Sequence, residues 1–184
     1  LARGMYSYDD RYFVTASYRR DGASVFGKGK KWGNYYAAGL AWKLTNEEFM
    51  PKTDILTNMK IKASWGVNGN QSISPFGTYS TMDVGKKGGT MYEFGDDKIL
   101  YGITTGALGN SELGWEETTA WNVGFESAWL KDRIFLDVDA YISQTRNQIF
   151  TRTIPVMTGF PSIKATMGQV NNRGLEITLK SVNI

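Results

Sequence analysis

The residue types that most often carry enzyme chemistry are missing from this sequence. The chain contains no histidine and no cysteine, so it offers no imidazole for proton transfer near neutral pH and no thiolate nucleophile. The common zinc-binding sets and the Ser-His-Asp and Cys-His arrangements are excluded with them. We therefore expect a protein that is not an enzyme.

Two aspartates, Asp137 and Asp139, come closest to an acid–base pair. Residues two apart in a strand point to the same side, so their carboxylates would share one face of a sheet. Glycoside hydrolysis needs a second carboxylate fixed across the substrate, and nothing in the sequence indicates one. Lys60, Lys62 and Arg19 are plausible counter-charges from other strands. We interpret the aspartates as part of a charged lining.

Two further groups resemble ligand sites only in composition. Four acidic residues could offer oxygen ligands to calcium, although their spacing fits no EF-hand loop; they are Asp83, Glu93, Asp96 and Asp97. The glycine-rich stretch around Lys30 resembles a phosphate-binding loop, but no serine or threonine follows the lysine and no helical pattern follows the loop. Solvated loop charge explains both groups, so we expect no metal site and no cofactor.

Four aromatic residues lie in a long polar segment, and they are Tyr92, Phe94, Tyr101 and Trp115. Exposed rings can stack on sugar faces or on the side chains of a partner, and in that interpretation the four residues bind substrate. In the alternative interpretation, the rings pack the loop against itself. The sequence leaves both open.

The overall charge is mild. Lysine and arginine total 21 against 18 aspartates and glutamates, a net charge of +3, and the basic residues are too scattered to indicate nucleic-acid binding. No apolar run reaches the roughly 18 residues that a transmembrane helix needs. Transmembrane β-strands stay possible, because they alternate lipid-facing and lumen-facing residues and have unremarkable average hydropathy.

The elements that would position these residues are β-strands. Apolar and polar residues alternate with a period of two wherever the chain is not turn-like, which predicts strands with one apolar and one polar face. We expect an all-β chain with seven antiparallel strands, at 1–8, 12–20, 36–44, 59–68, 121–129, 134–143 and 174–182. The side chains expected to line the lumen from the polar face are Arg19, Lys60, Lys62, Asn68, Asn122, Glu126, Asp137 and Asp139.

The connections between these strands alternate in length. Short turns join the strands at one end, whereas polar segments near 21–34, 69–117 and 147–168 join them at the other. The segment 45–58 is an exception on the short-turn side, where Thr45 and Glu48 predict a capping box and one or two helical turns. Short periplasmic turns and long extracellular loops are typical of outer-membrane barrels.

Aromatic residues gather at both ends of the apolar face, with aliphatic residues between them. The expected girdle residues are Tyr12, Trp42 and Trp129 at the short-turn end and Tyr18, Tyr36, Trp65 and Trp121 at the long-loop end. Amphipathic rings prefer the level of the lipid headgroups, so this pattern predicts a face in contact with outer-membrane lipid. The rival is a soluble or surface β-sandwich that binds carbohydrate, which would hide most of these tryptophans in a core.

Seven strands do not close a barrel of this kind, because single-chain bacterial barrels use even numbers from eight upward. In lipid, an open sheet would leave unpaired backbone groups at both edges, each costing several kcal/mol. We therefore expect residues 1–184 to be one segment of a larger barrel domain, and we expect the plug to lie outside this segment.

A series of short motifs also runs along the chain in a fixed order. They are Asp10-Arg11-Tyr12, Thr15-Ala16-Ser17, Arg19-Arg20-Asp21-Gly22, Phe26-Gly27, Lys31-Trp32-Gly33, Ala41-Trp42-Lys43-Leu44, Glu47-Glu48-Phe49, residues 60–71, Leu113-Gly114-Trp115-Glu116 and residues 170–176. In order and content this series resembles the C-terminal barrel half of the SusC/RagA family of TonB-linked outer-membrane proteins. Residues 81–105 match nothing in that pattern.

The resemblance implies a barrel of about 22 strands with an N-terminal plug. It also implies energy supplied by the TonB complex through parts outside this chain, and a SusD-like surface lipoprotein that closes over the extracellular mouth. The cargo of the family is glycans and, in some members, peptides. A passive porin-type channel would differ only in lacking TonB energisation.

Overall fold

The computed structural model of the protein describes residues 1–51, 53–71, 73–85, 91–93 and 99–183. Its main element is a seven-stranded antiparallel sheet in the order β1-β2-β3-β4-β9-β10-β13. The strands are β1 (Ala2–Tyr8), β2 (Tyr12–Gly22), β3 (Trp32–Lys43), β4 (Leu56–Asn70), β9 (Glu116–Trp129), β10 (Ile134–Arg146) and β13 (Gln169–Ser181). The prediction of seven antiparallel strands is confirmed.

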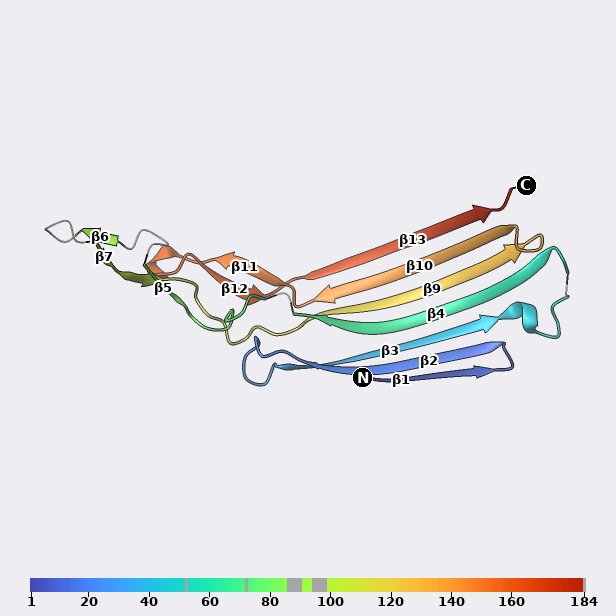
Figure 1. Ribbon diagram of the computed structural model, residues 1–184, viewed down its shortest axis with the longest axis horizontal. Helices are drawn as coiled ribbons and strands as arrows, with labels where there is room; N and C mark the ends of the chain where they lie inside the picture. The colour runs from blue at the N-terminus through green and yellow to red at the C-terminus, as the bar shows by residue number, and fades with distance from the viewer. Residues whose placement is uncertain (52, 72, 86–90, 94–98, 184) are drawn as a thin grey trace.

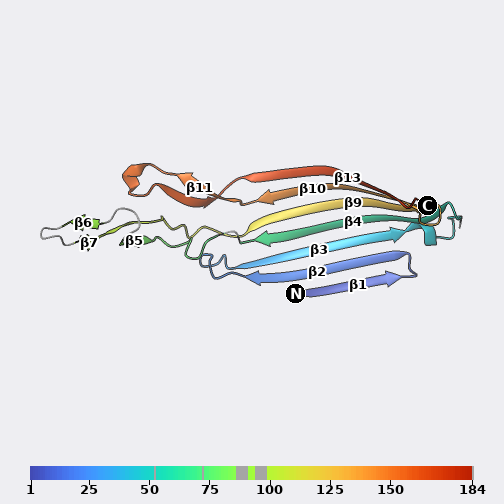
Figure 2. The same cartoon turned by 45° about the horizontal axis from the view of Figure 1, so that its top comes forward.

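The sheet is one curved layer rather than two packed layers, as Figure 1 and Figure 2 show from two directions. Its first and last strands, β1 and β13, lie at opposite edges. The sheet is therefore part of a barrel wall and does not close on itself. The β-sandwich alternative is wrong, since a sandwich requires a second sheet to cover the apolar face.

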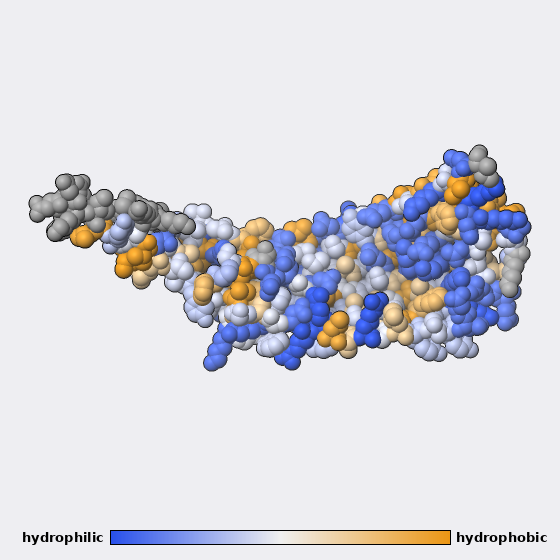
Figure 3. All heavy atoms as spheres, in the orientation of Figure 1, coloured by the Kyte–Doolittle hydropathy of each residue, from blue (hydrophilic) through white to orange (hydrophobic). Residues whose placement is uncertain are grey.

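The pairing register aligns residues of one kind across the whole sheet. One row joins small and aliphatic residues of five neighbouring strands, namely Leu40, Ala63, Val123, Ala140 and Leu175. The next row lies on the other face and includes Lys62, Gly124 and Asp139. Because side chains alternate between faces along each strand, this register gives the sheet one apolar and one polar face. Figure 3 views the sheet from a side on which hydrophilic residues predominate.

Tight turns close one end of the sheet. The β1–β2 turn passes through Asp9 and Asp10, and the β9–β10 turn passes through Leu130 to Asp132, all with positive φ between 48° and 63°. Aspartate tolerates the left-handed region better than most residues because its short polar side chain bonds locally. Both predicted hairpins are present.

Between β3 and β4 the described residues form a one-turn 3₁₀-helix, η1 (Leu44–Asn46). The predicted capping box is wrong. The observed N-cap is Lys43, two residues before Thr45, and it makes no side-chain cap. The buried Thr45 hydroxyl has no hydrogen-bond partner in the described structure. The side chain of Glu48, which would complete the box, is 91% exposed. Its neighbour Glu47 turns toward the sheet, where it accepts hydrogen bonds from aromatic residues.

The long connections extend the opposite end of the molecule (Figure 1). Their described residues form three small two-stranded sheets and a second one-turn helix that the sequence pattern did not predict. These are β5 (Met82–Val84) with β8 (Ile103–Thr105), β6 (Met91–Glu93) with β7 (Ile99–Tyr101), β11 (Ile149–Thr153) with β12 (Ser162–Thr166), and η2 (Val156–Thr158). The described residues form no helix that is long and apolar enough to cross a membrane.

A buried hydrophobic cluster lies in these connections. Ala23, Phe26 and Leu113 form a buried cluster, against which Trp115 and Ile149 pack. The apolar side chains of the sheet, by contrast, are largely exposed. A water-soluble protein would bury such a surface, so the sheet needs a partner other than water on that face.

Candidate functional site

The apolar face carries aromatic rings paired across neighbouring strands. Tyr12 stacks on Trp42 with ring centroids 6.3 Å apart, and Tyr18 contacts Tyr36 at 5.2 Å. These pairs follow from the register, which places the members of each pair directly opposite one another. The two pairs lie toward opposite ends of the β2–β3 ladder.

The other predicted girdle residues lie on the same face. Trp65 and Trp121 are opposite one another on β4 and β9, with ring centroids 5.9 Å apart, and Trp121 is 60% exposed. At the short-turn end, the indole N–H of Trp129 donates a 3.0 Å hydrogen bond to the Ser127 hydroxyl. This bond gives the indole N–H an acceptor on an otherwise apolar face.

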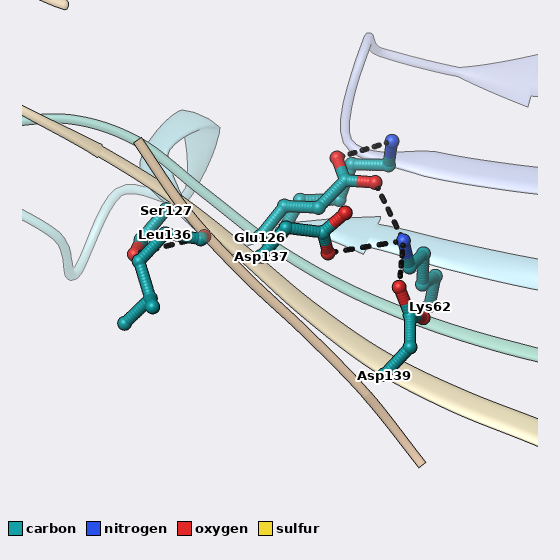
Figure 4. A network of polar contacts seen from close by, with 7 residues as sticks. Lys62, Glu126, Ser127, Leu136, Asp137 and Asp139 are labelled. Carbon is teal, nitrogen blue, oxygen red and sulfur yellow. Dashed lines mark hydrogen bonds and ion pairs between the residues drawn. The ribbon is translucent and has the colours of Figure 1, made fainter. Parts of the chain in front are cut away.

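The polar face is organised around one lysine, Lys62 (Figure 4). Its ammonium group lies 3.0 Å from a carboxylate oxygen of Glu126, 3.2 Å from one of Asp137 and 3.1 Å from one of Asp139. Lys60 contacts the other oxygen of Glu126 at 3.0 Å. Three strands, β4, β9 and β10, are thereby joined by charged side chains. We call these five residues the lysine network.

Gly124 makes the lysine network possible. In the register, Gly124 lies between Lys62 on β4 and Asp139 on β10, and a Cβ atom at this position would collide with both of their side chains. The lysine stem therefore crosses the sheet over the glycine to reach the aspartate. This role of Gly124 is not predictable from the sequence, because it depends on the register of three strands, of which β4 is distant in sequence from the other two.

The network does not have the geometry of an acid–base site. Both aspartates bind the same ammonium group through one oxygen each, so they form a pair with a cation and do not lie across a gap from a second carboxylate. Its charges are two cations against three carboxylates. Its chemical capacity is electrostatic: it ties three strands together, and the network itself has one more negative than positive group.

Arg19 does not supply the expected counter-charge to Asp137 and Asp139. Its guanidinium pairs with Asp21 on its own strand at 2.9 Å and lies over the Tyr35 ring, 5.5 Å from the centroid. Asn68 and Asn122 also lie outside the lysine network: in the register they are opposite Thr118 and Ser64. The structure thus joins five of the eight predicted lumen residues directly.

A second polar cluster lies at the short-turn end, centred on Glu47. Its carboxylate accepts hydrogen bonds from the Tyr12 hydroxyl at 2.6 Å and the Trp42 indole at 2.8 Å, and it lies 3.3 Å from the Arg11 guanidinium. The hydrogen bond from Tyr12, followed by that from Trp42, holds the pKa of Glu47 below its usual value. Glu47 therefore remains ionised and fixes both rings of a stacked girdle pair.

The loop aromatics differ in their surroundings. The Trp115 ring packs on Phe26 at 5.0 Å and on Tyr35 at 5.8 Å, which is the self-packing alternative. Trp115 also borders a polar cleft of about 440 Å³ that includes Trp32 and Glu112. Tyr101 is 55% exposed. Phe94 and the Tyr92 side chain lie outside the described residues.

The acidic residues considered as calcium ligands are only partly described. Asp83 belongs to β5, whereas Asp96, Asp97 and the side chain of Glu93 lie outside the described residues. Within the described part of the chain, no group of three or more acidic side chains is arranged to hold a metal ion.

Comparison with known proteins gives a consistent result. The family model for the TonB dependent receptor-like β-barrel matches residues 2–182. TonB-dependent receptor P39 of Formosa agariphila is 36% identical over 178 residues, which are 97% of this chain and 16% of that protein. TonB-dependent receptor SusC of Bacteroides thetaiotaomicron is 32% identical over 177 residues, or 96% of this chain and 17% of that protein.

The fold also matches solved structures. The structure of the RagAB peptide importer in the closed-closed state superimposes with a TM-score of 0.84 at 24% identity, covering 97% of this chain and 19% of the matched chain. At that identity the match concerns the fold alone. The chain spans less than a fifth of the length of each of these relatives.

Proposed function

The chain belongs to the TonB-dependent receptor-like β-barrel family, whose members are outer-membrane proteins, and we propose that it forms part of the wall of a nutrient importer. In this role the chain does no covalent chemistry. It separates a polar lumen from lipid, and its long connections contribute to capture of cargo outside the cell.

The observation that carries the proposal is the division of one sheet into two faces. The apolar face has aromatic pairs at both ends and exposed aliphatic residues such as Leu40 and Val123 between them. A lipid bilayer stabilises this arrangement, because aromatic rings prefer the headgroup level and aliphatic side chains prefer the hydrocarbon core. The polar face, with the lysine network, then faces the lumen, and the long-loop end lies outside the cell.

The partners and cargo follow by analogy with relatives. We propose a SusD-like surface lipoprotein as the lid, and energy from the TonB complex acting through parts of the full-length protein beyond this chain. The relative named SusC and the solved RagAB peptide importer support this class of transporter. Oligosaccharides or peptides are the proposed cargo. Among the described side chains, Tyr101 and Trp115 are candidates for contact with it.

A passive porin is the competing transport function. Growth of the parent bacterium on oligosaccharide or peptide mixtures, with the full-length gene present or deleted, would identify cargo that depends on this protein. The proposal expects uptake to fall on deletion and also when the proton-motive force is dissipated, because TonB-linked transport needs that energy. Uptake that survives dissipation of the proton-motive force but still needs the gene would favour the porin.

A further inference from the structure

Two arginines lie on the apolar face among the aromatic residues of the long-loop end. Arg20 is two residues beyond Tyr18 on β2. Both side chains therefore lie on the same face of the strand. Arg173 on β13 is opposite Ile142, which in turn is opposite Trp121. A guanidinium on a lipid-facing surface is energetically unfavourable unless an anion accompanies it. Each of these arginines therefore needs an anionic partner.

Arg20 is held in place by an aromatic ring. Its guanidinium carbon lies over the Trp32 ring, 4.9 Å from the centroid. Trp32 can lie there because Gly22, which is opposite it in the register, has no side chain: a Cβ atom on Gly22 would lie 2.7 Å from the Trp32 ring. This stacking orients the guanidinium and leaves its N–H groups free to donate.

Arg173 borders a shallow apolar groove. The groove has a volume of about 400 Å³ and is lined by Trp121, Val123, Ala140 and Ile142 together with the arginine. Small Ala140 lies between the larger side chains. An acyl chain is apolar and therefore matches the lining of this groove. The guanidinium of Arg173 would then lie at the level of the lipid headgroup.

Neither arginine forms a salt bridge or a hydrogen bond with any residue in the described part of the chain. The contrast with Arg19 is direct, because that neighbour of Arg20 points to the opposite face and pairs with Asp21 at 2.9 Å. Arginine presents a planar fork of donors that matches phosphate oxygens in pairs. Phosphate is also the charged group that lipid headgroups present at this level of a membrane.

We propose that Arg20 and Arg173 bind phosphorylated headgroups of outer-leaflet lipids, with Trp32 and the Trp121 groove as their apolar supports. This inference rests on the outward orientation of the apolar face proposed above. It assigns the two arginines to lipid contact and leaves cargo to the lumen and loops.

The test uses the full-length protein purified in detergent and incubated with diphosphorylated lipid A or with the same lipid after removal of its phosphates. Native mass spectrometry measures the bound lipid. We expect the phosphorylated lipid to bind more tightly, and we expect Arg20→Gln and Arg173→Gln each to weaken it roughly fivefold to tenfold. The double variant should lose the preference for phosphate.

Arg19→Gln is the matched control, because Arg19 lies next to Arg20 on the other face. It should bind lipid as the unmodified protein does. Heat-dependent mobility on gels verifies that each variant still folds as a barrel. Equal binding of the two lipids, unchanged binding by the double variant, or an equal loss in Arg19→Gln would each overturn the lipid sites. In a protein that still fractionates with the outer membrane, such a result would leave the importer proposal intact.

Discussion

Replacement of Lys62 by methionine is the perturbation with the largest expected effect on the polar face. The substitution keeps the length of the side chain but removes ion pairs of 3.0, 3.2 and 3.1 Å to Glu126, Asp137 and Asp139. The lysine side chain is 31% exposed and its partners are 30–42% exposed. Solvent-exposed pairs contribute about 0.2–1 kcal/mol each, and these partly shielded pairs belong near the upper end of that range.

Summed over three pairs, we expect Lys62→Met to lower the free energy of unfolding by about 2 kcal/mol. Lys60→Met is the comparison, since it removes only one contact and leaves Glu126 paired with Lys62. Its expected cost is about 0.5–1 kcal/mol. The assay is thermal or denaturant unfolding of the full-length barrel in detergent, followed by the gel mobility of the folded and unfolded forms.

A rescue experiment separates charge from packing. In the Lys62→Met background, Asp137→Asn and Asp139→Asn remove the two carboxylates that lost their cation, so they should recover part of the lost stability. Equal effects of Lys62→Met and Lys60→Met, or no recovery in the triple variant, would refute the role assigned to the lysine network.

Three further predictions concern the two ends of the sheet. Glu47→Leu should lower the unfolding temperature more than Glu48→Leu, because Glu47 binds Tyr12 and Trp42 whereas Glu48 has a 91% exposed side chain; similar shifts would contradict this. Leu113 is 0% exposed, so Leu113→Ala should open a cavity in the buried cluster of the loops and destabilise that cluster by about 2–5 kcal/mol. Proteolytic cleavage of the loops should then be faster, and unchanged cleavage would show that the cluster does not hold the loops together. The Lys30 ammonium, at 2.6 Å, lowers the pKa of Glu112. Because the folded pKa lies below the unfolded one, this stabilisation is present above the unfolded pKa and is lost as pH falls through the folded one. Pepsin cleavage of the loops should therefore increase as the pH falls through the folded pKa of Glu112. The Glu112→Gln variant should show a weaker dependence of cleavage on pH.

The strands were predictable where the membrane imposes a pattern. Between Tyr12 and Tyr18, or between Ile134 and Ile142, one face of the sheet is apolar and the other polar, so apolar residues recur with period two. The structure extends β9 outward to Glu116 and β10 to Arg146. Those extensions were missed because polar residues occupy both faces there, which erases the alternation.

The lysine network was predictable in membership but not in geometry. Period two placed Lys60, Lys62, Glu126, Asp137 and Asp139 on one face, whereas their contacts depend on which residues lie opposite one another. The same limit explains the error about Arg19, whose nearest carboxylate is on its own strand.

Short elements in the loops could not be predicted for a different reason. Strands of three residues, such as β5 and β8, are too brief to show a period. At the short-turn end, Thr45 and Glu48 matched a local capping signal, but the one-turn helix begins at Leu44 and Glu48 is exposed. The neighbouring Glu47 instead binds Tyr12, which lies 35 positions away, and such a contact leaves no local signal in the sequence.

The most direct test of the account is a nitroxide scan along β13 in the full-length protein reconstituted in lipid. Cysteines are introduced one at a time at 175–179 in a background without other cysteines, and electron paramagnetic resonance measures the collision of each spin label with oxygen, which concentrates in the bilayer. If the apolar face contacts lipid, oxygen accessibility is high at Leu175, Ile177 and Leu179 and low at Glu176 and Thr178. Uniform accessibility, or maxima at the even positions, would contradict the assignment of the apolar face to lipid.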